Sequence, residues 1–102
     1  MTIFKLVKRV KILGLVYSCA LENIDQKDGS MGVVRLLLRE IAIDPYADRI
    51  KSLTHEIVHA FAYALGGTLD EGWTDRIAQA SIAFMTDNAA LVRRMVDYLE
   101  AQ

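Results

Sequence analysis

Residues 52–60 of this chain read SLTHEIVHA and contain the pattern H-E-x-x-H, with histidines at positions 55 and 59. On an α-helix, side chains four residues apart lie one turn apart on the same face, so His55 and His59 can reach a single metal ion. They are the only two histidines in the sequence, and such a pattern arises by chance in roughly one comparable sequence in a thousand. We therefore interpret the stretch as a metal-binding helix rather than an amphipathic helix that happens to contain two histidines.

Residues on either side of this stretch set the expected ends of the helix. Pro45 ends the strand before it, Asp48 is a suitable N-cap, and Gly66 and Gly67 end the helix after Leu65. Apolar side chains recur on the side of the helix opposite the histidines, where we expect them to face the core: Ile50, Leu53, Ile57, Phe61 and Leu65.

A third protein ligand has to be a carboxylate, because no other histidine is available. We expect it to be Glu71, which opens a second helix just after the glycine turn and can fold back beside the first helix. Asp70 is an alternative, and a site without a third protein ligand also stays open, because residues 68–71 have the pattern of a capping box. Asp75, one turn after Glu71, could orient a ligand histidine by hydrogen bonding.

The donor set favours zinc, although imidazole and carboxylate ligands also accept iron, nickel or manganese. Zinc in such a site lowers the pKa of a bound water to about 7. Glu56 would accept the proton of that water as general base and pass it to the leaving amine of a peptide.

H-E-x-x-H followed by E-x-x-x-D resembles the gluzincin metallopeptidases, and most closely their minimal, phage- and mobile-element-borne versions, the minigluzincins and ImmA/IrrE-like peptidases. The matching motifs are IAID at 41–44, SLTHEIVHA at 52–60, the glycine pair at 66–67 and LDE at 69–71. The resemblance covers roughly residues 10–102. It implies a zinc-dependent peptidase in which His55, His59 and Glu71 hold the metal and a small sheet lies over two active-site helices.

This chain departs from the family pattern at three points. The interval from His59 to Glu71 is shorter than in large gluzincins, Gly72 replaces a second acid, and no third histidine is available to stabilise an oxyanion. Candidates for that last role are Tyr63, our preferred catalytic partner of Glu56, together with Tyr46 and Arg76.

The whole chain, residues 1–102, is expected to form one α+β domain, with a mostly antiparallel sheet of three to four strands followed by three helices. Residues 4–21 predict a hairpin that turns at Gly14, and Asp28-Gly29 marks a further turn. Residues 33–43 predict a third strand, whose edge-like end at 39–43 could bind an extended peptide.

Two further helices are expected, from about Asp70 to Met85 and from a cap at Asp87 or Asn88 to the C-terminus. The first of them carries apolar residues at helical spacing, which we assign to the core: Trp73, Ile77, Ala80 and Phe84. The last helix has one apolar face, formed by Leu91, Val92, Met95 and Leu99.

Composition limits the other function classes. The chain is 53% hydrophobic and 25% charged with a net charge of -1, which is typical of a globular domain and does not favour nucleic-acid binding. No apolar stretch is long enough to span a membrane. The single cysteine, Cys19, is expected to be buried in a cytoplasmic protein, with an N-terminal secretory signal as the alternative.

We expect a peptide or protein substrate. The rival interpretations are a zinc-stabilised module that does not cleave and a regulatory interaction domain without metal, and the sequence leaves the oligomeric state open. Sensitivity of the melting curve to a chelator separates these rivals.

Overall fold

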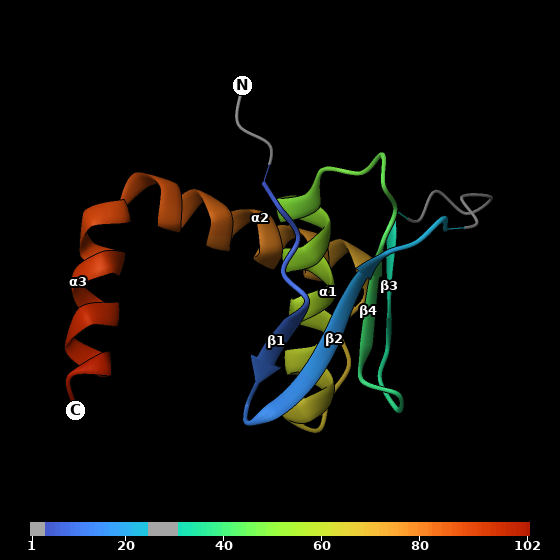
Figure 1. The fold of residues 1–102 in the computed structure, drawn as a ribbon, viewed down its shortest axis with the longest axis horizontal. Coiled ribbons are helices and arrows are strands. Elements are labelled where there is room, and N and C mark those ends of the chain that lie inside the picture. The colour runs from blue at the N-terminus through green and yellow to red at the C-terminus, as the bar shows by residue number, and fades with distance from the viewer. Residues whose placement is uncertain (1–3, 25–30) are drawn as a thin grey trace.

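The computed structural model describes residues 4–24 and 31–102 and has a four-stranded sheet followed by three helices (Figure 1). This α+β architecture confirms the order of elements expected from the sequence. The predicted Asp28-Gly29 turn lies outside the described residues. The elements are β1 (Arg9–Ile12), β2 (Leu15–Leu21), β3 (Gly32–Arg35), β4 (Glu40–Ile43), α1 (Arg49–Ala64), α2 (Glu71–Asp87) and α3 (Ala89–Glu100).

The sheet is mixed, so the expectation of a mostly antiparallel sheet is wrong. Its strand order is β1-β2-β4-β3, with antiparallel pairs at β1–β2 and β3–β4 and a parallel pair at β2–β4. The parallel pair arises because the second strand of the β3–β4 hairpin, not the first, lies beside β2. This arrangement places β3 at the edge of the sheet, where it faces the helices that follow.

The β1–β2 hairpin forms as predicted. Ile12 pairs with Leu15, and the two residues between them, Leu13 and Gly14, both have positive φ, at 48° and 85°. Such a two-residue turn matches the right-handed twist of the flanking strands, and Gly14 adopts this conformation without steric cost.

The single strand predicted over residues 33–43 is instead two strands joined by a tight turn. Arg39 has a φ of 53°, and its amide donates to the carbonyl of Leu36 over 3.3 Å. The leucines inside the turn, Leu37 and Leu38, are exposed, although their apolar character suggested a strand. Consequently β4 is a central strand with neighbours on both sides, and it is not the peptide-accepting edge that we expected.

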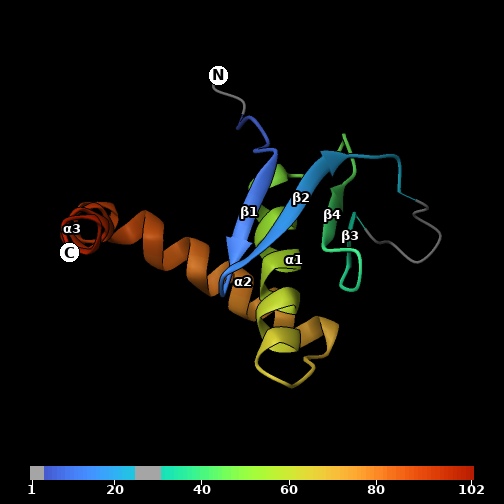
Figure 2. The same cartoon turned by 60° about the horizontal axis from the view of Figure 1, so that its bottom comes forward.

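Helix α1 lies across one face of the sheet, and α2 packs on the side of α1 away from the sheet (Figures 1 and 2). Asp48 caps α1 as predicted, its side chain accepting from the amide of Lys51 over 3.0 Å. The face of α1 that meets the sheet consists of Leu53, Glu56 and Ala60, which are all buried. The core beneath it includes Ile12, Tyr17, Cys19, Ile41 and Ile43.

The predicted core face of α1 is therefore wrong in part. Leu53 is buried and Ile57 is partly buried, but Ile50, Phe61 and Leu65 are exposed. The buried face includes Glu56 and Ala60 and is therefore rotated toward the histidines.

The core assignment for the apolar residues of α2 is also wrong. Trp73, Ile77, Ala80 and Phe84 are exposed, whereas Thr74 and Ala78 are buried against α1. The small residues form the contact because they allow the two helices to lie close together. Among the described residues, none of the helices is both long and apolar enough to cross a bilayer.

Candidate metal centre

The two histidines lie one turn apart on α1, with their ring centroids 4.9 Å apart and their planes at 71°. Their side chains are shielded, with 15% of His55 and 19% of His59 exposed. A position on the flank of α1 beside α2, rather than on its solvent face, explains this shielding. Both rings are thus held where a second helix can bring a third ligand to them.

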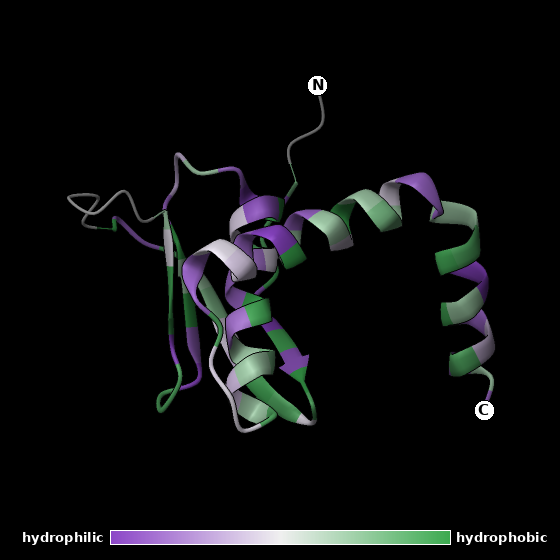
Figure 3. Cartoon of the chain, turned by 180° about the vertical axis from the view of Figure 1, so that it is seen from behind, coloured by the Kyte–Doolittle hydropathy of each residue, from purple (hydrophilic) through white to green (hydrophobic). Residues whose placement is uncertain are grey.

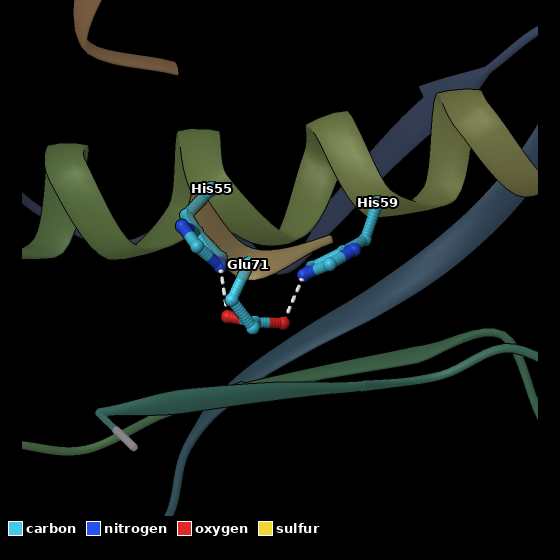
Figure 4. A group of neighbouring side chains, drawn as sticks. All are labelled: His55, His59 and Glu71. Carbon is cyan, nitrogen blue, oxygen red and sulfur yellow. Dashed lines mark hydrogen bonds and ion pairs between the residues drawn. The ribbon is translucent and has the colours of Figure 1, made fainter. Parts of the chain in front are cut away.

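Glu71, the first residue of α2, supplies that third group. One of its carboxylate oxygens lies 2.8 Å from His55 Nε2 and the other lies 2.6 Å from His59 Nε2 (Figure 4). Asp70 acts as the N-cap of α2, its side chain accepting from the amide of Trp73 over 2.8 Å. The cap therefore fixes the start of the helix, and with it the position of Glu71, while Asp70 itself is not part of the cluster.

These three side chains could hold a metal ion, because one ligand atom from each lies within 4.8 Å of the others. The donor set fits a divalent metal that accepts two imidazoles and a carboxylate. The orientation fits as well, since both Nε2 atoms point toward one carboxylate. The Glu71 side chain is 79% exposed, so the open side of the cluster is accessible from solvent.

The far nitrogens of the two rings face partners on α2. His55 Nδ1 lies 3.6 Å from Asp75 Oδ1, and the other Asp75 oxygen accepts from Gln79 over 2.6 Å. This places Asp75 beside His55, the neighbour that the sequence predicted for it. A carboxylate on this side of the ring favours a proton on Nδ1, which leaves Nε2 free to bind metal.

Thr74 is a neighbour of the site that sequence reasoning missed. It is fully buried, its hydroxyl donates to the carbonyl of Asp70 over 2.8 Å, and its Oγ1 lies 3.5 Å from His59 Nδ1. A proton on Nδ1 can therefore be donated to Oγ1 while Nε2 faces the metal position. The sequence could have indicated this position, because Thr74 lies three residues after Glu71 and hence on the same face of α2.

Glu56 lies next to the cluster but on the sheet side of α1. It is only 6% exposed, and burial raises its pKa, while the nearby histidines act in the opposite direction. A raised pKa makes this carboxylate a stronger base than a free glutamate side chain.

Two cavities, of about 370 and 360 Å³, meet at the cluster. Both are lined by Glu56, Glu71 and Gly32, the first residue of the edge strand β3, so together they form one groove between β3 and the helices. A side chain at Gly32 would bring a Cβ to 3.3 Å from Glu56 Oε2 and 3.2 Å from the backbone oxygen of Ala42. Glycine at this position therefore keeps the groove open beside Glu56.

The three candidates for stabilising an oxyanion lie in different places. Tyr63 lines the cavity that contains His59, and Tyr46 lines the cavity that contains His55. Arg76 lies over the ring of Trp73, 5.1 Å from its centroid, and lines neither cavity. The geometry keeps both tyrosines in the groove and sets Arg76 apart from it.

Comparisons with protein-family models, curated proteins and solved structures found no match to this chain. The functional argument therefore depends on the motif and on the geometry of the site.

Proposed function

We propose that this protein is a zinc-dependent peptidase of the minimal gluzincin type. One observation carries the proposal: His55, His59 and Glu71 converge beside the buried Glu56 at the middle of an open groove. A structural metal site has no need of a shielded carboxylate in an accessible groove. The combination instead matches the requirements of metal-assisted hydrolysis.

In this proposal the two histidines and Glu71 hold zinc, with Asp75 and Thr74 orienting the rings. Zinc, when bound, acidifies a water and polarises a substrate carbonyl. Glu56 accepts a proton from the attacking water and returns it to the amine that leaves when the peptide bond breaks.

The edge strand β3 is the proposed binding site for the peptide backbone. It pairs with β4 on one side only, and its residues Gly32, Val33 and Val34 line the groove on the other. An extended peptide added to this edge would run past Glu56 and the metal position, with its backbone hydrogen-bonded to β3.

Tyr63 is the proposed donor to the developing oxyanion, because it lines the same cavity as Glu56 and His59. Tyr63→Phe should lower the hydrolysis rate about 100-fold with zinc content unchanged. Tyr46→Phe is the matched control, since it removes the same hydroxyl from the other half of the groove. Equal hydrolysis rates for Tyr63→Phe and wild type would show that a residue other than Tyr63 stabilises the oxyanion.

Glu56→Gln tests the function as a whole. We expect this variant to keep zinc and its fold but to lose hydrolysis of a fluorescently labelled, unfolded protein, while Glu100→Gln, an exposed change on α3, behaves as wild type. Full turnover by Glu56→Gln would contradict the mechanism. Zinc binding by wild type with a large chelator-sensitive rise in melting temperature, but without turnover, would instead support the zinc-stabilised, non-catalytic module.

A further inference from the structure

Helix α3 stands away from the rest of the molecule. It follows α2 at a sharp bend and makes no contact with α1 or with the described strands (Figures 1 and 2). None of its residues is buried. The radius of gyration is 14.2 Å, compared with about 13 Å for a compact chain of this length.

This helix is strongly amphipathic, although none of its residues is buried by another described element. Figure 3 shows apolar segments alternating with polar ones along α3. The apolar side chains lie on one side of the helix and are 46–66% exposed: Leu91, Met95, Val96, Tyr98 and Leu99. Asn88 forms no side-chain cap, and a helix of 12 residues is only marginally stable by itself in water. A partner surface that covers its apolar side would stabilise this helix.

A matching surface exists on the same chain, at a place that α3 does not reach. An apolar groove of about 410 Å³ runs between α1 and α2, contains none of the metal-cluster residues, and is lined by Ile57, Phe61 and Ile77 among others. Phe84 extends this surface along α2, because it lies seven residues after Ile77 and hence on the same face. Phe61, Ile77 and Phe84 are among the residues that the sequence assigned to the core and that a single chain leaves exposed.

We propose that a second copy of this chain covers both surfaces, with α3 of each copy lying in the α1–α2 groove of the other. Eight large apolar side chains of α3 and the groove are 38–66% exposed. At roughly 150–250 Å² per large side chain, covering them would remove roughly 800 Å² on each copy, or roughly 1,600 Å² in the pair. This area is that of a stable interface. The exchange is reciprocal, so the contact closes on itself as a two-fold dimer. It involves none of the metal-site residues and stands apart from the proposed activity.

Sedimentation equilibrium over a range of protein concentrations tests the dimer. The full chain should have twice the 11.4 kDa mass of one copy. Met95→Glu on α3 and Ile77→Glu in the groove should each give monomers, while Leu37→Glu, an equally drastic change in the exposed β3–β4 turn, should remain a dimer. Wild-type protein that stays monomeric, or Met95→Glu protein that stays dimeric, would overturn the proposal.

Mixing the two monomeric variants tests the reciprocal arrangement and also controls for misfolding. A mixed pair keeps one intact contact, between the unchanged α3 of the Ile77→Glu copy and the unchanged groove of the Met95→Glu copy. We expect the mixture to recover part of the dimer, which requires both variants to be folded. No recovery on mixing would overturn the docking of α3 into the groove.

Discussion

Replacing Thr74 by valine removes a hydroxyl from the most buried part of the α1–α2 contact and keeps the side-chain shape. In the structure this hydroxyl donates to the carbonyl of Asp70 over 2.8 Å and lies 3.5 Å from His59 Nδ1. The substitution leaves the Asp70 carbonyl with only the backbone amide of Thr74 as donor, at 3.0 Å, and leaves His59 Nδ1 without this partner. We expect it to affect both stability and metal affinity.

The two contacts predict effects of different size. Loss of a buried hydrogen bond costs about 1 kcal/mol, equivalent to a fall of about 4–8 °C in the melting temperature of a domain of this size. Loss of the partner of a ligand histidine typically weakens metal binding 10- to 100-fold. Because 3.5 Å is long for an N–H···O hydrogen bond, we expect about 10-fold.

Thr86→Val is the matched control for this substitution. Thr86 lies on the same helix, and its hydroxyl donates to the carbonyl of Ile82 over the same 2.8 Å, but it is exposed and away from the histidines. Competition with a chromogenic chelator gives the zinc affinity, and circular dichroism gives the melting temperature of the metal-free protein. Equal zinc affinity in the two variants would refute a role for Thr74 in positioning His59.

Three other predictions follow from burial and spacing. Burial raises the pKa of Glu56, so the metal-free protein should lose free energy of unfolding as pH rises through the unfolded-state pKa of a glutamate. The advantage of Glu56→Gln in urea titrations should therefore widen as pH rises above about 4, and a constant difference would contradict this. Gly32→Ala should destabilise the fold by about 1–3 kcal/mol and slow hydrolysis, because its Cβ meets a backbone oxygen at 3.2 Å, whereas Gly67→Ala, whose Cβ makes only an ordinary 3.9 Å contact with the Ala62 backbone oxygen, should do neither. Burial also raises the pKa of the Cys19 thiol, so alkylation should be slow in the folded protein and fast in urea; fast labelling without urea would place the thiol at the surface.

Local signals in the sequence predicted the elements that depend on neighbouring residues. Gly14 indicated the β1–β2 turn, Asp48 and the glycine pair indicated the ends of α1, and the order of strands and helices followed. The cluster itself was predictable because helical spacing alone places His55 beside His59, and a short turn leaves Glu71 little freedom.

The remaining features depend on contacts between distant parts of the chain. Nothing local distinguishes β4 from β3 as the neighbour of β2, so the parallel pair and the true edge strand were not predicted. The apolar residues of α2 were assigned to the core because an apolar stripe usually faces one; here small side chains form the α1–α2 contact instead. Thr74 was missed because its role depends on which face of α2 meets α1.

Metal content per chain, measured on protein purified without added metal and again after zinc addition, tests the central claim most directly. Wild type should bind about one zinc per chain, and His55→Ala and Glu71→Ala should each lose most of it, since both remove a member of the cluster. Wild-type protein that takes up no zinc would contradict the metal centre. Zinc that is lost with His55→Ala but kept with Glu71→Ala would show that Glu71 is not a ligand.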